Sequence, residues 1–176
     1  IVVRLVGSEM CIRDSKGPIL YFQERVGRNG VNFRICKLRT MQINAEKEGI
    51  QWSKRGDSRI TRVGNFLRKS RIDELPQLFS VLLGQMSLIG PRPERPEIDL
   101  ILKEEISFYE MKYLMKPGLS GWAQVNYPYG SSIKDAEHKL SYDFYYIKNF
   151  SFWLDFIIFC KTIRLVLRRE GSVPQQ

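Results

Sequence analysis

The dipeptide Asn29-Gly30 constrains the fold of this chain of 176 residues more than any other local feature. Both residue types tolerate the positive φ angles of a tight turn. A strand-like run, 19–22, precedes the turn, and apolar residues alternate with other types over 31–36 after it. This pattern predicts a β-hairpin over residues 18–38.

One residue interrupts the pattern of the hairpin. Lys37 falls on the apolar side of the alternation, where an unpaired cation is costly. We therefore expect Lys37 either to end the strand or to point into an anion-binding site together with Arg39.

Two helices are predicted after a polar, loop-rich stretch over 42–58. The first follows Thr61, and the second spans the helical spacing of 75–83 and stops at Gly84. Asp73 is the expected N-cap of the second helix, because Asp favours that position and Pro76 is tolerated in a first turn. Packing is expected to bury five apolar side chains of the two helices, namely Phe66, Leu75, Leu78, Phe79 and Leu82.

Later segments alternate between helices and constrained turns. We expect helices over 97–114 and 134–148, separated from the preceding helices and from each other by the Gly- and Pro-rich stretches 87–93 and 116–122. The segment 150–167 is rich in Phe, Ile and Leu but contains three charged residues, so it does not qualify as a spanning helix. It is interpreted as an amphipathic helix that lies either on a membrane surface or on the core.

The charge of the chain limits the kind of partner it can have. The formal net charge is +9, and residues 11–75 alone hold 15 Lys and Arg against 7 Asp and Glu. Such an excess favours a polyanionic partner, either nucleic acid, an anionic membrane or a phosphorylated substrate, although a basic solubilising surface is the alternative. His138 and the scattered cysteines 11, 36 and 160 lack the spacing of a zinc site.

The adjacent carboxylates Asp73 and Glu74 are the best candidates for chemistry. They could simply cap a helix and interact with its dipole. Basic residues nearby, Arg68, Lys69 and Arg71, would however keep both carboxylates ionised and attract a phosphate group. An ionised Asp can attack phosphorus, while a second carboxylate can hold a divalent cation.

Arg92 lies between two prolines in Pro91-Arg92-Pro93. This tripeptide could be ordinary loop punctuation. Alternatively, the prolines stiffen the backbone, so that the Arg92 guanidinium loses less entropy when it binds phosphate.

Three stretches stand together in an order typical of one protein family. They are KLRTM (37–41), the long segment 57–97 with RIDELPQL and MSLIGPRP, and KPGLSGWAQVN (116–126). They resemble the bacterial sugar transferases, which are monotopic phosphoglycosyl transferases, and the resemblance runs from about residue 14 to residue 170.

The resemblance implies a reaction and its site. Members transfer a sugar-1-phosphate from a UDP-sugar to a polyprenyl phosphate, usually undecaprenyl phosphate, and release UMP in the first membrane step of exopolysaccharide or glycoconjugate assembly. Asp73 would be the nucleophile that forms a covalent phosphosugar intermediate, and Glu74, together with Asp73, would hold the cofactor Mg²⁺. The implied residues for the nucleotide or its phosphates are Arg92, Arg68, Lys37 and Arg39.

The resemblance also implies an organisation and a location. It predicts a helix-dominated α+β fold, with a single compact catalytic domain over 13–170, the small antiparallel hairpin and amphipathic helices on a membrane surface. Residues 1–12 do not resemble the apolar re-entrant helix of the family, and 171–176 form a tail, so we expect little turnover from the chain without its anchor. The expected location is the cytoplasmic face of the bacterial inner membrane.

Other partners and functions are also compatible with parts of the sequence. The expected partners are the UDP-sugar, the polyprenyl phosphate and the anionic membrane surface. The sequence leaves open whether the chain also forms a homodimer. A nucleic-acid-binding module is not favoured, because no known motif for it is present and the carboxylates would repel a phosphate backbone. An inactive membrane-associated scaffold is the remaining alternative.

Overall fold

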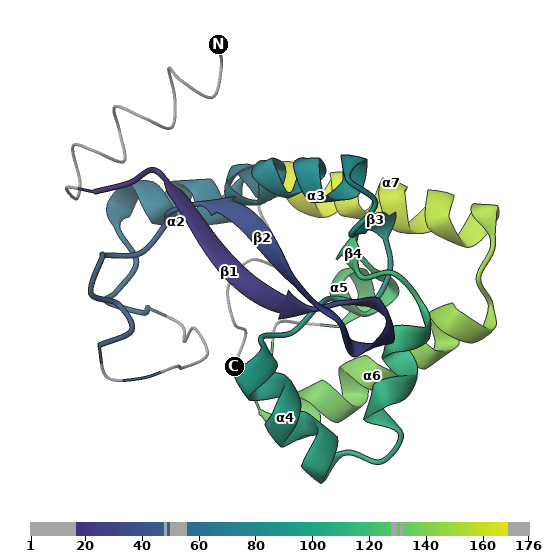
Figure 1. The fold of residues 1–176 in the computed structure, drawn as a ribbon. Helices are drawn as coiled ribbons and strands as arrows, with labels where there is room; N and C mark the ends of the chain where they lie inside the picture. The colour runs from purple at the N-terminus through teal and green to yellow at the C-terminus, as the bar shows by residue number, and fades with distance from the viewer. Residues whose placement is uncertain (1–16, 48, 50–55, 128–129, 131, 169–176) are drawn as a thin grey trace.

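The computed structural model describes residues 17–47, 49, 56–127, 130 and 132–168. It shows a helix-dominated α+β architecture with two small sheets. In Figure 1 the long hairpin crosses the middle of the molecule, with α3 and α7 toward one side of it and α4 and α6 toward the other. The predicted boundary between residues 12 and 13 and the predicted tail lie outside the described residues.

The predicted hairpin is confirmed. Strand β1 (Leu20–Val26) pairs antiparallel with β2 (Asn32–Leu38), from Leu20 opposite Leu38 to Val26 opposite Asn32. The turn between them contains the short 3₁₀ helix η2 (Arg28–Gly30), where Asn29 and Gly30 have φ angles of 58° and 73°. These are the positive φ angles for which the Asn-Gly pair is suited.

The helices after the hairpin differ in part from the prediction. The first, α2 (Arg62–Lys69), is confirmed, with the Thr61 side chain accepting a hydrogen bond from the backbone N–H of Gly64. The second is a 3₁₀ helix, η3 (Ile72–Gln77), that continues as α3 (Leu78–Leu82).

The expectation that Asp73 caps the second helix is wrong. The N-cap is Arg71, which adopts the left-handed conformation with a φ of 56°, and Asp73 lies inside the first turn of η3. Because the helix starts earlier than predicted, Pro76 falls inside it and removes an N–H that an α-helical ladder would use.

A second sheet was not predicted. Strand β3 (Ser87–Ile89) pairs in parallel with β4 (Gly118–Ser120), within two stretches that the sequence indicated as constrained loops. The backbones come so close that a Cβ placed on Gly118 would lie 2.1 Å from the backbone nitrogen of Gly90. Glycine is therefore required at this crossing, and the GPRP and PGLSG stretches are joined in space.

Five further helices complete the described chain. The predicted helix over 97–114 is split into α4 (Pro96–Glu105) and the 3₁₀ helix η4 (Tyr109–Leu114), because the chain turns at Phe108 with a φ of 61°. The short α5 (Trp122–Asn126) follows β4. The last two predicted helices are confirmed as α6 (Ile133–Lys148) and α7 (Phe152–Arg168).

The core lies mainly between the hairpin, α4, η4 and α6, and between β3, α6 and α7. Its two larger clusters contain Val26, Leu102 and Tyr109 in the first and Tyr146 and Ile158 in the second. Helix α7 joins this core through one edge, since Leu154 and Ile158 are buried. No helix among the described residues is both long enough and apolar enough to cross a membrane.

The expected burial of five apolar side chains is wrong. Leu82 is 82% exposed and Phe79 is 70% exposed, and Phe66, Leu75 and Leu78 are also exposed, whereas the neighbouring Leu67 is 1% exposed. The periodicity of 75–83 marks a face that no described residue covers.

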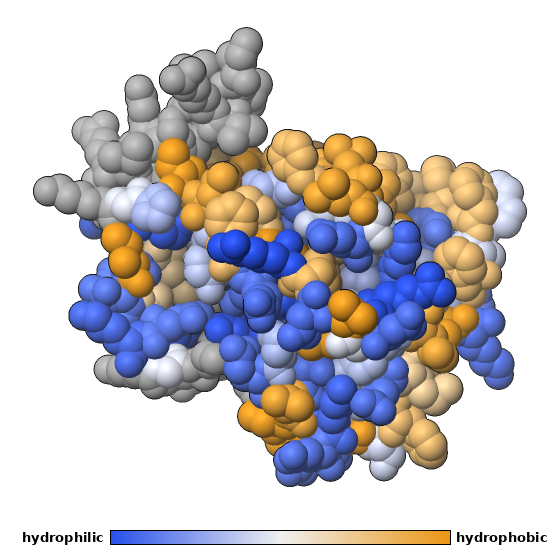
Figure 2. All heavy atoms as spheres, in the orientation of Figure 1, coloured by the Kyte–Doolittle hydropathy of each residue, from blue (hydrophilic) through white to orange (hydrophobic). Residues whose placement is uncertain are grey.

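Exposed apolar side chains of α3, of Leu83 directly after it and of α7 form what we call the apolar face. Both helices contact β3, and Figure 2 shows hydrophobic residues gathered along the edge where Figure 1 places them. The members of the apolar face are Leu78, Phe79, Leu82, Leu83, Phe152, Trp153, Phe156, Phe159, Ile163 and Leu167.

Candidate active site

Asp73 and Glu74 lie in the first turn of η3, and both are 8% exposed. The Glu74 carboxylate is held by three basic side chains. Lys37 Nζ and Arg92 Nη2 donate to Oε1 at 3.0 and 2.7 Å, and Arg71 Nη1 donates to Oε2 at 3.4 Å. Glu74 therefore joins strand β2, the start of η3 and the loop after β3 at one point.

These cations determine the charge of Glu74. Burial alone would raise the pKa of Glu74, but Arg92, Lys37 and Arg71 outweigh it and hold the pKa well below its usual range. Burial also lowers the pKa of Lys37 to about 8, against the opposing effect of Glu74. Lys37 thus points into the site, which is the second of the two expectations for it, and at neutral pH it remains largely a cation.

Asp73 differs from its neighbour in having an unused acceptor. Its Oδ1 atom is buried and has no hydrogen-bond partner among the described residues. Burial and the charge of Glu74 raise the pKa of Asp73 to about 6, against the opposing effects of Lys37, Arg68 and Arg71. The carboxylate is therefore mostly ionised at neutral pH, as expected, but it is less stabilised than that of Glu74.

All predicted site residues line one cavity of about 750 Å³. They are Lys37, Arg39, Arg68, Asp73, Glu74 and Arg92. Arg68 Nε donates to Thr40 Oγ1 at 2.9 Å, and Arg39 Nη2 donates to the Gly17 carbonyl at 3.3 Å. The structure brings the six residues together, and their individual roles stay predictions.

The sequence missed several polar residues of this cavity. Arg25 and Arg95 add cations, and Arg25 lies on the β1 strand of the predicted hairpin. A further group consists of Glu94, Lys112, Lys139 and Asp143. Nothing in the local sequence marks these four, because they come from the loop before α4, from η4 and from α6.

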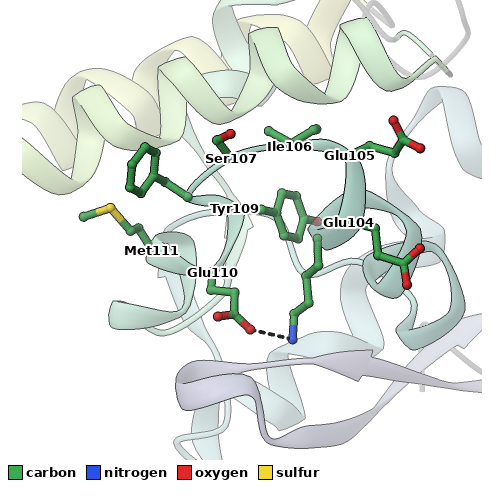
Figure 3. A pocket seen from close by; sticks show the side chains of 9 residues that line it. Glu104, Glu105, Ile106, Ser107, Tyr109, Glu110 and Met111 are labelled. Carbon is green, nitrogen blue, oxygen red and sulfur yellow. Dashed lines mark ion pairs between the residues drawn. The ribbon is translucent and has the colours of Figure 1, made fainter.

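A second hollow of about 590 Å³ lies at the turn between α4 and η4. Figure 3 shows that one local segment, 103–111, lines it, with Glu104, Glu105 and Glu110 around it and Lys103 paired to Glu110 at 3.0 Å. Three glutamates in one shallow hollow do not suit an anionic substrate, and none of the predicted site residues lies there.

The fit of Mg²⁺ to the dyad differs between the two carboxylates. Asp73 Oδ1 is a hard oxygen without a partner among the described residues, and Mg²⁺ often binds proteins through one or two carboxylates plus substrate phosphates. Both oxygens of Glu74 already accept hydrogen bonds from basic side chains. Within the described chain no cluster of three or more His, Cys, Asp or Glu side chains could hold a metal. Asp73 is thus suited to be a ligand of Mg²⁺, whereas Glu74 already binds the surrounding basic side chains.

Comparison with known proteins matches the chain to three relatives in particular. It is 50% identical over 159 residues to a UDP-N-acetylgalactosamine-undecaprenyl-phosphate N-acetylgalactosaminephosphotransferase of Aeromonas hydrophila. This match covers 90% of this chain and 38% of the relative. It is 40% identical over 161 residues to a UDP-glucose:undecaprenyl-phosphate glucose-1-phosphate transferase of Xanthomonas campestris pv. campestris, covering 90% and 33%. A Caulobacter vibrioides protein of the same name is 39% identical over 161 residues, and the match covers 90% of this chain and 60% of that relative.

The chain therefore spans well under two thirds of the length of the first two relatives. The model of the family described as bacterial sugar transferase matches residues 2–169. This chain belongs to the bacterial sugar transferase family.

Proposed function

We propose that this domain transfers a sugar-1-phosphate from a UDP-sugar to undecaprenyl phosphate and releases UMP. The observation that carries the proposal is the pairing of an unpartnered carboxylate, Asp73, with Glu74 and its three cations in one cavity. The names of the relatives, which act on UDP-N-acetylgalactosamine and UDP-glucose with undecaprenyl phosphate, support the same reaction. The step would begin the assembly of a polysaccharide or glycoconjugate.

The geometry supports a two-step transfer through Asp73. Its carboxylate attacks the sugar-bearing phosphorus, a P–O bond forms to Asp73, and the P–O bond to UMP breaks. An oxygen of undecaprenyl phosphate then attacks the same phosphorus, and the bond to Asp73 breaks, which restores the carboxylate. The charge on the phosphate oxygens is balanced at both steps by the neighbouring cations of the cavity.

Glu74 acts on this chemistry through the side chains it binds. By accepting from Lys37, Arg71 and Arg92, it fixes the positions of three cations before the donor arrives. Such preorganisation lowers the cost of stabilising charge in a transition state. When Mg²⁺ is bound, with Asp73 as its ligand, it would screen the repulsion between the nucleophile and the diphosphate.

We assign the apolar face to the cytoplasmic surface of the bacterial inner membrane. The acceptor carries a long apolar chain in the bilayer, and the nucleotide donor is water-soluble, so the site must work at their boundary. Large apolar side chains on α3 and α7 are exposed, and α7 also carries the exposed basic residues Arg164 and Arg168. This combination suits an interfacial helix on anionic lipid.

The reaction is tested by UMP release from the purified chain in detergent with undecaprenyl phosphate, MgCl₂ and each of four donors. The donors are UDP-glucose, UDP-galactose, UDP-N-acetylgalactosamine and UDP-N-acetylglucosamine, because the relatives differ in their sugar. Without acceptor, mass spectrometry should detect a chain heavier by one sugar phosphate, and Asp73→Asn should abolish both signals. Glu105→Gln, in the second hollow, is the matched control. An Asp73→Asn chain that still carries the adduct would overturn the assignment.

A further inference from the structure

The cavity has a second polar arm that the proposed mechanism does not use. This inner arm is formed by Gln124 on α5, Asp143 on α6, and the lysines Lys112 and Lys139 of η4 and α6. It opens into the same 750 Å³ cavity as the Asp73 dyad. The dyad and the inner arm therefore belong to one continuous cavity.

Asp143 is the central feature of the inner arm. It is 6% exposed, it lines the cavity, and it forms no hydrogen bond or ion pair with any residue that the structure describes. Burial raises the pKa of Asp143 to about 7, against the opposing effects of Lys112 and Lys139. A buried carboxylate without a hydrogen-bond donor destabilises a fold, so its presence calls for an explanation.

The two lysines do not supply that explanation, because each has another partner. Lys112 Nζ donates to the Tyr109 hydroxyl at 3.0 Å and lies over the Tyr109 ring. Lys139 Nζ donates to the Gly130 carbonyl at 2.7 Å. They influence Asp143 through space only, and its oxygens stay available to a ligand.

Gln124 supplies a second available acceptor. Its Nε2 donates to the Leu119 carbonyl at 3.3 Å, which fixes the amide, while Oε1 is buried and has no partner in the described chain. Both available groups of the inner arm are thus acceptors of hydrogen bonds. The matching ligand must bring donors.

The charge around the inner arm selects among the parts of a nucleotide sugar. Asp143 and Glu94 line this region together with Lys112 and Lys139, so the region has no excess of cations to attract a phosphate group. The phosphates have a better place among Lys37, Arg71 and Arg92 near the dyad. An uncharged ring with several hydroxyl groups offers donors without bringing negative charge.

We propose that Asp143 and Gln124 bind hydroxyl groups of the donor's transferred sugar. This inference rests on the proposed function, since it takes the donor to be a nucleotide diphosphate sugar. The ribose of the nucleotide presents the same chemistry and is the alternative source of the hydroxyls. In either case the inner arm sets the orientation of the donor relative to Asp73.

Calorimetric titration of the chain with UDP-sugar, UDP and UMP tests the assignment. The donor is the one with the largest turnover in the UMP assay, and the variants are Asp143→Asn, Gln124→Met and the control Glu137→Gln, an exposed residue of α6. If the transferred sugar occupies the inner arm, both site variants weaken the binding of UDP-sugar by about tenfold or more and leave the affinity for UMP unchanged. Equal weakening of UDP-sugar, UDP and UMP assigns the arm to the ribose.

Other outcomes separate this inference from the proposed function. Unchanged affinity for all three ligands in both variants overturns the inner-arm assignment, even if wild type binds and turns over the donor. A wild-type chain that binds none of the donors overturns the proposed function itself. Thermal melting shows whether the variants are folded, and Asp143→Asn is expected to melt no lower than wild type because it removes a buried charge. A lower melting temperature with intact donor affinity would assign Asp143 a purely structural role.

Discussion

The cavity and the apolar face are opposite exceptions to the usual distribution of residues. In the cavity, the carboxylates Asp73 and Glu74 are 8% exposed, whereas on the apolar face Leu82 is 82% exposed. Folded proteins rarely bury ionised groups or expose contiguous apolar patches without a reason. In the proposed function each unusual surface has its own partner, the substrate for the cavity and a membrane for the apolar face.

The sharpest test of the cavity is the loss of its nucleophile. Asp73→Asn keeps the size of the side chain but removes the negative charge that attacks phosphorus, so turnover should fall by about a thousandfold or more. UMP release measures the loss, with Glu105→Gln as the control for a carboxylate outside the cavity. Retained turnover in Asp73→Asn would make the cavity a binding site and not a reaction centre.

Glu74 tests whether the buried charges of the cavity depend on each other. Glu74→Gln leaves Lys37, Arg71 and Arg92 clustered without their common anion, so it should lower the free energy of unfolding by about 3–5 kcal/mol. Urea denaturation followed by circular dichroism measures this. A loss below about 1 kcal/mol would show that water already balances the three cations.

The apolar face predicts the reverse behaviour. Phe79→Ala and Leu82→Ala should each change the free energy of unfolding by less than about 0.5 kcal/mol, because their side chains are already exposed. Each should nevertheless weaken binding to anionic lipid vesicles by about tenfold, since a buried Leu or Phe contributes about 1.5–3 kcal/mol.

Leu67→Ala is the matched variant for that test. Leu67 is 1% exposed, so its truncation should cost about 2–5 kcal/mol of unfolding free energy. Cosedimentation with vesicles and urea denaturation give the two readouts. If Leu82→Ala destabilises the chain as much as Leu67→Ala, the apolar face is covered by protein and the comparison fails.

The same contrast explains which parts of the molecule could be predicted. The hairpin followed from Asn29-Gly30, because turn chemistry and alternation are local. The helical spacing of 75–83 correctly predicts an apolar stripe, but periodicity does not say whether protein or lipid covers a stripe. Burial of Leu82 was therefore the wrong inference from a correct pattern.

Non-local features could not be predicted. Strands β3 and β4 are three residues each, and they form only because two distant segments meet at Gly90 and Gly118. The dyad and Arg92 could be found from their motifs. Asp143 could not, because its significance depends on a cavity built from other helices.

The smallest effect we predict links this unmarked residue to stability. Burial raises the pKa of Asp143 from 3.8 to about 7 in the folded chain, where Lys112, Lys139 and Glu94 face it. The folded state therefore holds a proton more firmly than the unfolded state, and wild type loses stability as the pH rises from about 4 to 7. Asp143→Asn avoids that loss, so at pH 8 it should be more stable than wild type by about 1–2 kcal/mol. This is less than the free energy that corresponds to the whole pKa shift, because the site can relax and admit water. Below about pH 4 the difference should vanish, because Asp143 is then protonated in both states.

Urea denaturation at pH 4, 6 and 8 measures the dependence, with Glu137→Gln as the control. A difference that stays constant with pH would show that Asp143 carries no unbalanced charge, and the cavity would then hold a single unpartnered carboxylate, Asp73.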